Sequence, residues 1–290
     1  MKYISPRKPD YLKISLPTDE NYFSINKVLK DSNINTVCTH AKCPNIFECW
    51  SKRHLTFMIL GSHCTRRCAF CSVETKKPHE VSEVDERELD TIPELVAKLE
   101  LNHVVITSVT RDDLPDEGAS HFVKLVERIR AKAPRVTIEL LIPDFKPPAL
   151  QRIIELKPTV LAHNMETVSR LYKKIRPRAR YNYSLELLHS IKKQNSHILS
   201  KAGFMLGIGE REEEVHTLLQ DIHASNIDIV TIGQYLQPTL QNAPVTRYYK
   251  PEEFLAFKNY AHSIGIKNVE SGPFVRSSYY SEHTLQNIKK

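Results

Sequence analysis

The chain has 290 residues, 41% of them hydrophobic, which is enough for one large core or two smaller ones without disulfide staples. Residues 1–17 lack the apolar core of a signal peptide, and no apolar run approaches the about 20 residues that span a bilayer, so we expect a cytoplasmic protein without a membrane partner. The net charge of +7 permits an anionic partner. The densest basic run, residues 173–180, lacks the spacing of a nucleic-acid-binding motif, so no nucleic-acid partner is expected.

Strand-like and helix-like segments alternate through the middle of the chain. Strands are predicted at 56–60, 103–109, 136–142, 159–165, 201–208 and 227–235. Helices are predicted at 92–100, 119–132, 147–156, 166–175, 183–194, 210–225 and 251–265. This alternation indicates an α/β fold with a parallel sheet, either doubly wound or a barrel. No G-x-G-x-x-G follows the first strand, and six strand–helix units predict a partial (β/α)6 barrel of the TIM type.

Polar residues cluster directly after each predicted strand. The clusters are "HCTRRCAFC", "TSVTRDD", "IPDF", "HNMET", "GIGE" and "QYLQP". Parallel barrels build their sites at the carboxyl ends of strands, so we expect the site there. Gly203, Gly207 and Gly209 surround one such end, either for close approach to a ligand or for tight packing. We expect residues 1–52 and 266–290 to extend a barrel formed by residues 53–265.

All six cysteines fall in two triplets, Cys38, Cys43 and Cys49, then Cys64, Cys68 and Cys71. In a reducing compartment such clusters more often bind metal than form disulfides. Three thiolates can hold a four-iron cube and leave one iron free, whereas a closed zinc site would need a histidine such as His40 or His63. Nearby bases are expected to favour the thiolates: Lys42, Lys52 and Arg53 at the first triplet, and Arg66 and Arg67 at the second.

The spacing C-x3-C-x2-C, with the aromatic Phe70 and a preceding barrel strand, resembles the radical S-adenosylmethionine (SAM) superfamily. The earlier C-x4-C-x5-C is similar to the lipoyl synthase family. That similarity extends over about residues 35–280 and includes "TFMILG", "VITSVTRDDLPDEG", "HNMETV", "GFMLGIGE", "TIGQYLQP" and "ESGPFVRSSY". "GSHC" at 61–64 departs from the family pattern, in which an acidic residue is commoner, but it changes no ligand.

The resemblance implies two 4Fe-4S clusters and SAM as cofactors. One cluster would be held by Cys64, Cys68 and Cys71, with its free iron chelating SAM. The auxiliary cluster would be held by Cys38, Cys43, Cys49 and Ser278, the last within the R-S-S-Y motif, so that Arg276 and Ser278 are candidate catalytic residues. SAM would be contacted around Phe70, Thr107, Ser108, Asn164, Glu166, Arg176, Tyr235 and Gln237.

The implied reaction inserts two sulfur atoms, donated by the auxiliary cluster, at C6 and C8 of an octanoyl chain carried on a lysine. The implied partners are octanoylated lipoyl carrier domains (acyltransferase, or E2, subunits of dehydrogenase complexes and the glycine-cleavage H protein), an electron donor such as flavodoxin or ferredoxin, and a carrier protein that rebuilds the cluster. A monomer is expected. A methylthiotransferase-like enzyme and a zinc-dependent nucleic-acid-binding protein remain as alternatives.

Overall fold

The computed structural model describes residues 5–14, 17–279 and 281–288. Seven strands form one sheet in the order β1-β4-β5-β6-β7-β8-β9. Their bounds are β1 Thr56–Ile59, β4 His103–Ser108, β5 Thr137–Leu141, β6 Val160–Ala162, β7 Leu199–Leu206, β8 Ile229–Gln234 and β9 Asn268–Gly272. A doubly wound sheet reverses its strand order at a switch point, whereas this order follows the chain throughout. The predicted α/β class with a partial barrel is therefore confirmed, and the doubly wound alternative is wrong.

Each predicted helix has a counterpart. These are α4 Glu88–Lys98, α5 Ala119–Lys132, α6 Pro147–Glu155, α7 Tyr172–Ile175, α8 Tyr181–Gln194, α9 Glu212–Ala224 and α10 Pro251–Ser263. The helix predicted at 166–175 is shorter, because a 3-10 turn at Ser169–Leu171 precedes α7. Further helices are α1 Glu20–Ser32, α2 Val37–His40, α3 Ile46–Ser51 and α11 Ser281–Ile288. Two short strands, β2 His63–Cys64 and β3 Glu74–Thr75, pair separately.

Strand β9 corrects the prediction of six strands. It pairs in parallel with β8 over Ile229 to Gly233 and lies inside the segment expected to be a C-terminal extension. Only Val269 of its five residues is buried, so the strand shows neither an apolar run nor a clear alternation. Its pairing with β8, and not its own composition, makes it a strand.

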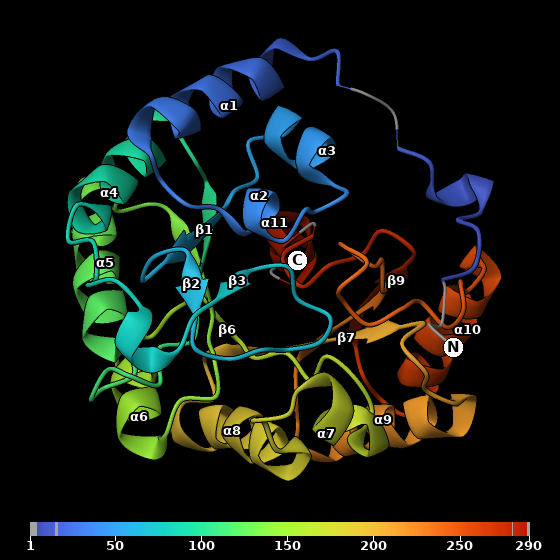
Figure 1. Cartoon of the computed structure of the whole chain (residues 1–290). Helices are drawn as coiled ribbons and strands as arrows, with labels where there is room; N and C mark the ends of the chain where they lie inside the picture. Colours follow the sequence, from blue (N-terminus) through green and yellow to red (C-terminus); the bar gives the residue numbers. More distant parts are fainter. Residues whose placement is uncertain (1–4, 15–16, 280, 289–290) are drawn as a thin grey trace. The chain divides into compact units, whose positions relative to one another are not determined.

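The chain forms two compact units. The amino-terminal unit comprises Ser15–Arg66 and Val73–Leu161, and the carboxy-terminal unit comprises Met1–Ile14, Arg67–Ser72 and Ala162–Lys290. In the amino-terminal unit, α4 packs on α5 and α5 on α6 outside strands β4 and β5 (Figure 1). In the carboxy-terminal unit, α8 packs on β7 and α10 on β9. The division at residues 52 and 265 stays a prediction.

The turn after β1 is fixed by buried charges in the amino-terminal unit. Leu60 and Gly61 both have left-handed backbones, with φ of 67° and 93°. The Glu88 carboxylate accepts hydrogen bonds from their N–H groups at 2.9 and 3.2 Å and lies 3.0 Å from Nε2 of His121. Arg111 donates to the Leu60 carbonyl at 3.2 Å. The start of the second cysteine loop is therefore held in place from both sides.

Replacing Glu88 by alanine is expected to lower the free energy of unfolding by about 3 kcal/mol, because buried N–H groups and a histidine lose their partner. Glu88 is only 3% exposed. Urea unfolding measures the change. Glu86→Ala is the control, since Glu86 is exposed and 3.9 Å from Lys124, and it should change stability by no more than about 0.5 kcal/mol. Equal effects of the two substitutions would contradict this account of the turn.

Candidate iron–sulfur and SAM site

The first cysteine triplet comes together within the amino-terminal unit. Cys38 lies in α2, Cys49 lies in α3, and Cys43 lies on the loop between these helices. The Cys43 N–H donates to the Cys38 carbonyl at 3.0 Å, which turns the chain back on itself. Cys43 raises the pKa of Cys38, and both Cys43 and Cys38 raise the pKa of Cys49, so the three thiols are near neighbours. The spacing C-x4-C-x5-C thus folds into one cluster of thiols.

Burial is the main influence on the pKa values of Cys38 and Cys49. Burial raises the pKa of the Cys38 thiol to about 11, and nearby Cys43 adds to the rise. Burial also raises the pKa of Cys49, where Cys43 and Cys38 add to it and Lys52 opposes it only weakly. The Lys52 ammonium is 2.7 Å from the Glu48 carboxylate, which offsets its charge. Lys52 does favour the Cys49 thiolate, as expected, but burial outweighs it, so the pKa values of both Cys38 and Cys49 are raised and metal binding there would displace protons.

Trp50 supplies a polar group for this cluster. Its ring is 1% exposed and stacks on Tyr22 at 5.7 Å. The buried indole N–H has no protein partner with hydrogen-bond geometry among the described residues. It lies close enough to Cys38 to oppose the burial-driven rise in that thiol's pKa. Because hydrogen bonds to the sulfurs tune iron–sulfur clusters, an N–H group beside Cys38 fits a cluster better than empty apolar packing.

The first half of the second triplet's loop is anchored in the amino-terminal unit. The Thr65 N–H donates to the Thr110 carbonyl at 3.0 Å, and the Thr65 hydroxyl donates to Asp112 at 2.9 Å. The Arg66 guanidinium bonds the Asp112 carboxylate through two nitrogens, at 2.8 and 3.1 Å, and also bonds Asp144. Two carboxylates thus balance Arg66, which holds the loop. Sequence reasoning assigned no role to Asp112 or Asp144, although both lie in predicted strand-end clusters.

The second half of this loop is anchored in the carboxy-terminal unit. The Ala69 N–H donates to the Ile175 carbonyl at 2.9 Å, and the Ala69 carbonyl accepts from the Ala243 N–H at 2.7 Å. The Cys71 carbonyl accepts from the side-chain amide of Asn242 at 2.7 Å. Phe70 lies half-buried between these anchor points. The segments after β6 and β8 therefore fix the backbone that carries Cys68 and Cys71.

Two predicted SAM contacts lie at the end of β4. The Thr107 hydroxyl donates to the Leu141 carbonyl at 2.8 Å and is used within the sheet. The Ser108 hydroxyl is buried and has no partner in the part of the chain that the structure describes. A buried hydroxyl without a partner is costly, so it fits a site that a polar ligand completes.

Asn164 and Glu166 form a strained turn at the end of β6. Asn164 donates to the Glu166 carboxylate at 2.9 Å, and Glu166 has a φ of 64°. The backbone of Glu166 is held by Gly203 and Met205 of β7, at 3.0 and 2.9 Å. The side-chain amide oxygen of Asn164 is buried with no partner among the described residues, which again fits a polar ligand. Strained polar turns of this kind are typical of binding sites.

Arg176 supports the turn formed by Asn164 and Glu166. It is buried, donates to the Asn164 carbonyl at 2.9 Å and to the Tyr172 hydroxyl at 3.2 Å, and lies over the Tyr172 ring at 5.3 Å. This contact with the Asn164 backbone lets Arg176 hold the turn in place. Its predicted contact with SAM stays a prediction.

Tyr235 and Gln237 are both used to shape the loop after β8. Burial raises the pKa of Tyr235, and its hydroxyl donates to the Ala243 carbonyl at 2.6 Å. The Gln237 amide donates to the Asn242 carbonyl at 2.8 Å and accepts from the Ser5 hydroxyl at 2.6 Å. The structure therefore gives both residues a role in the loop, and their predicted contact with SAM stays a prediction.

The glycines at the end of β7 serve packing. A Cβ atom on Gly203 would lie 2.6 Å from the Thr231 hydroxyl oxygen, and one on Gly207 would lie 2.4 Å from the Arg247 carbonyl. The Glu210 carboxylate accepts hydrogen bonds from the N–H groups of Ile208 and Gly209 at 3.0 and 3.1 Å. The packing alternative is thus supported for Gly203 and Gly207, whereas Gly209 has a left-handed backbone, with a φ of 120°, and no close neighbour.

The R-S-S-Y motif forms a turn after β9. The Tyr279 N–H donates to the Arg276 carbonyl at 3.0 Å, and Ser278 is half-buried within the turn. The Arg276 guanidinium donates to the Val275 carbonyl at 2.7 Å. Gly233 of β8 permits this arrangement, because a Cβ there would lie 2.0 Å from the Val275 carbonyl oxygen. The ligand role of Ser278 and the catalytic role of Arg276 stay predictions.

The closed zinc site loses both of its candidate histidines. Nε2 of His40 is 2.9 Å from the Asn35 side-chain oxygen. His63 has Nε2 3.2 Å from Glu74 and Nδ1 3.1 Å from the Ser62 hydroxyl. Within the described ranges no three histidine, cysteine, aspartate or glutamate side chains are placed to hold a single metal ion. None of the six cysteines forms a disulfide bond in this structure.

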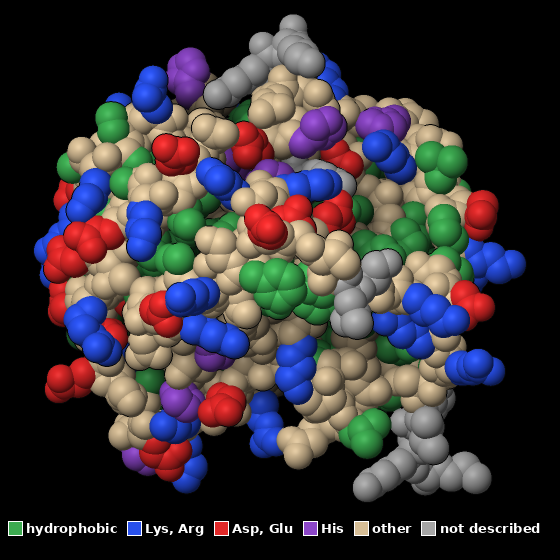
Figure 2. All heavy atoms as spheres, turned by 90° about the horizontal axis from the view of Figure 1, so that it is seen from above, with side chains coloured by type: hydrophobic (Ala, Val, Ile, Leu, Met, Phe, Trp, Pro, Cys, Tyr) green, Lys and Arg blue, Asp and Glu red, His purple; other side chains and the backbone are tan. Residues whose placement is uncertain are grey.

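The surface shows mixed charge. Lysine and arginine side chains alternate with aspartate and glutamate over most of the face in Figure 2. In the described part of the chain no helix is both long and apolar enough to cross a bilayer. Because basic and acidic side chains are mixed on the face in Figure 2, the positive net charge does not form one broad basic patch there.

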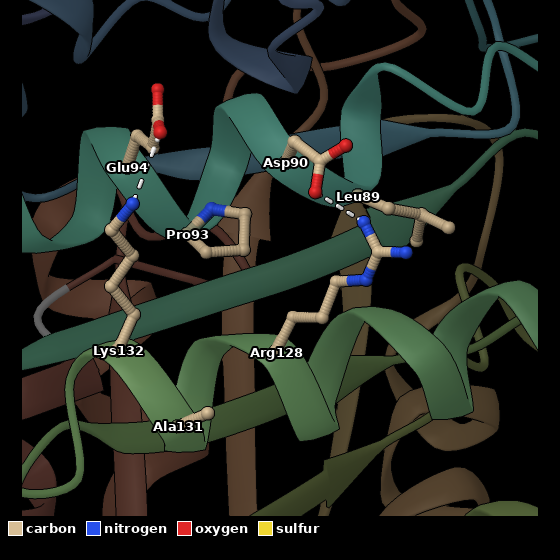
Figure 3. Close-up of a pocket in the computed structure, with 7 residues that line it drawn as sticks. All are labelled: Leu89, Asp90, Pro93, Glu94, Arg128, Ala131 and Lys132. Carbon is tan, nitrogen blue, oxygen red and sulfur yellow. Dashed lines mark hydrogen bonds and ion pairs between the residues drawn. The ribbon is translucent and has the colours of Figure 1, made fainter.

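A pocket between α4 and α5 is unrelated to the cysteines. It is lined by Leu89, Asp90, Pro93, Glu94, Arg128, Ala131 and Lys132. Figure 3 shows Lys132 paired with Glu94, at 3.0 Å, and Arg128 paired with Asp90 across this pocket. These exposed pairs link two helices on the outside of the sheet and leave no polar group free for chemistry.

A partial parallel barrel with a three-cysteine loop after its first strand, and unsatisfied polar atoms at later strand ends, defines an iron–sulfur enzyme that binds a polar small-molecule cofactor. Residues 58–222 match the sequence model of the radical SAM superfamily. This match covers more than half of the chain, which therefore belongs to that superfamily. Membership implies a 4Fe-4S cluster and SAM, and Cys64, Cys68 and Cys71 remain the predicted ligands.

Solved structures show the same fold. Methylornithine synthase (PylB) matches with a TM-score of 0.56 and 16% identity, over 72% of this chain and 62% of that one. The FeFe-hydrogenase maturase HydG from Carboxydothermus hydrogenoformans matches with a TM-score of 0.55 and 12% identity, over 92% and 78%. Coproporphyrinogen III oxidase (HemN) from Escherichia coli matches with a TM-score of 0.52 and 13% identity, over 71% and 51%. The chain spans between 55% and 62% of the first solved structures it matches.

Proposed function

We propose that the protein is a lipoyl synthase, which inserts sulfur at C6 and C8 of an octanoyl chain attached to a lysine of a carrier domain. The observation that carries this proposal is the first cysteine triplet, which lies outside the radical SAM motif. Cys38, Cys43 and Cys49 gather in the amino-terminal unit, with the Trp50 N–H beside Cys38. A radical SAM reaction that only abstracts hydrogen needs no further cluster ligands of this kind. A reaction that inserts sulfur needs them, because a second cluster must supply two sulfur atoms to each substrate.

The chain's residues have separate tasks in this proposal. When bound, SAM and the reduced cluster supply a hydrogen-abstracting 5′-deoxyadenosyl radical, and the auxiliary cluster supplies sulfur. The loop of Cys64, Cys68 and Cys71 holds the SAM-binding cluster at the strand ends. Ser108 and Asn164 offer unsatisfied polar atoms to SAM. Ser278 would complete the auxiliary ligand set with an oxygen donor, which binds iron less well than thiolate at such a site and so favours release of sulfur.

The overall reaction balances as follows. Two C–H bonds, at C6 and C8, would be replaced by two C–S bonds. Each sulfur would leave the iron of the auxiliary cluster as sulfide, and that iron would take the one electron released as each C–S bond forms. Each hydrogen atom leaves on one 5′-deoxyadenosine, and each of two SAM molecules also yields one methionine. Each cleavage of SAM takes one electron from an external donor, for which we propose a flavodoxin or a ferredoxin. A further carrier protein would rebuild the consumed cluster.

Anaerobically reconstituted protein should convert an octanoyl-lysyl peptide, in the presence of SAM and a reductant, to a lipoyl peptide with about two 5′-deoxyadenosines per product. Iron and sulfide analysis should give about eight irons per chain, from two four-iron cubes. Mass spectrometry of the peptide measures sulfur insertion. Formation of 5′-deoxyadenosine with no sulfur in the peptide, by protein that contains both clusters, would contradict the proposed substrate. Protein that binds only zinc would contradict the whole scheme.

A further inference from the structure

The loop after β8, residues 237–243, contacts the backbone of the second cysteine triplet directly. The Asn242 side-chain amide donates to the Cys71 carbonyl at 2.7 Å, although 171 residues separate them in the chain. The Ala243 N–H donates to the Ala69 carbonyl at 2.7 Å. All of these residues belong to the carboxy-terminal unit. The loop thus holds the carbonyl groups of Ala69 and Cys71, the residues on either side of Phe70.

The orientation of Asn242 is determined by its neighbours. The Cys71 carbonyl can only accept a hydrogen bond, so the amide nitrogen must face it. The Thr239 hydroxyl donates to the Asn242 side-chain oxygen at 2.7 Å, which holds the amide that way round. The Asn242 backbone carbonyl accepts from Gln237 at 2.8 Å. Asn242 is therefore held at both its side chain and its backbone.

The loop itself is anchored to buried structure. Tyr235, which is 2% exposed, donates its hydroxyl to the Ala243 carbonyl at 2.6 Å. The Ser5 hydroxyl donates to Gln237 at 2.6 Å and accepts from the Val245 N–H at 2.8 Å. Ser5 and the residues that follow β8 thus hold the loop in place. Tyr235 and Gln237 can therefore support the cysteine loop without touching SAM.

We propose that Asn242 is a positioning residue for the SAM-binding cluster. By holding the Cys71 carbonyl it fixes the backbone that presents the third thiolate, and so the orientation of the cluster toward SAM. Small displacements of groups that support a metal ligand commonly cost 10- to 100-fold in affinity or activity. The inference rests on the first step of the proposed function, SAM cleavage, and is independent of sulfur insertion.

The test compares Asn242→Asp with Gln241→Glu in the reconstituted enzyme. Aspartate has the size of asparagine but puts an oxygen against the Cys71 carbonyl, whereas Gln241 is exposed and its substitution adds the same charge one residue away. For Asn242→Asp we expect an altered electron paramagnetic resonance spectrum of the reduced cluster with SAM. The KM for SAM should rise about tenfold, and 5′-deoxyadenosine formation should fall about 10- to 100-fold. Gln241→Glu should match the wild type within about twofold.

Thr239→Val provides an independent variant, because it leaves Asn242 in place and removes the hydroxyl that donates to the Asn242 amide oxygen at 2.7 Å and accepts from the Gln241 N–H at 3.3 Å. It should alter the same spectrum and raise the KM for SAM by about threefold, while circular dichroism stays that of the wild type. If Asn242→Asp does not fold, the spectra and KM values of Thr239→Val and Asn242→Ala test the role of Asn242 instead. Spectra and KM values equal to those of Gln241→Glu would overturn the inference. Failure of the proposed function would appear instead in the wild type, as 5′-deoxyadenosine without sulfur insertion.

Discussion

Cys64→Ala is expected to abolish reductive cleavage of SAM, lowering 5′-deoxyadenosine formation by at least about 10³-fold, or more than about 4 kcal/mol of activation free energy. The chemistry depends on a cluster with three protein thiolates and one open iron, and no side chain can replace it. With one thiolate lost, the cluster is either absent or ligated at the wrong irons. Liquid chromatography of 5′-deoxyadenosine, with dithionite as the reductant, measures the effect.

Ser62→Ala is the matched control for this substitution. Ser62 lies on the same loop, two residues earlier, and its hydroxyl contacts only the His63 ring in the described contacts, at 3.1 Å. The variant should retain cleavage within about threefold, and iron analysis should give the wild-type content. Cleavage by Cys64→Ala at the wild-type rate would exclude Cys64 as a cluster ligand. An equal loss in Ser62→Ala would show that the assay reports general damage to the loop.

The central strands could be predicted because they are buried on both faces. β1, β4 and β8 are continuous apolar runs that end at a polar cluster, and this pattern is visible without tertiary information. β9 could not be predicted, because its residues become a strand only through pairing with β8. Helix α7 was predicted too long because the local periodicity did not show the 3-10 turn before it. Local pattern therefore sufficed for the barrel's centre and failed at its edge.

The same limit applies to the site. The cysteine triplets were found from the sequence because spacing within a loop is a local property. The residues that support them were not, because Asn242 and Asp144 act from 171 and 78 residues away in the chain. Burial is also a tertiary property. The sequence shows Lys52, which lowers the pKa of Cys49, but not the burial that raises the pKa of Cys38 and Cys49. Family resemblance supplied candidate roles, and the structure supplied the contacts that hold the candidates.

Cys38→Ala is expected to separate the two halves of the proposed reaction. The auxiliary cluster should be lost, so iron content should fall from about eight to about four per chain. Lipoyl product should fall by at least about 100-fold, because no sulfur donor remains. Cleavage of SAM should persist within about fivefold, since Cys64, Cys68 and Cys71 are untouched. Parallel assays of iron, 5′-deoxyadenosine and peptide-bound sulfur in one reconstituted sample measure all three.

Cys43→Ala distinguishes loss of the cluster from loss of packing. Cys38 is 8% exposed, so its truncation also leaves a small cavity, whereas Cys43 is half-buried and packs less tightly. Both variants should show the same separation, and Ser278→Ala should share it if Ser278 is the fourth ligand. Equal loss of SAM cleavage and sulfur insertion, in variants that retain the SAM-binding cluster, would contradict a separate donor. The two thiol clusters would then serve one step, and the sulfur atoms would have to come from elsewhere.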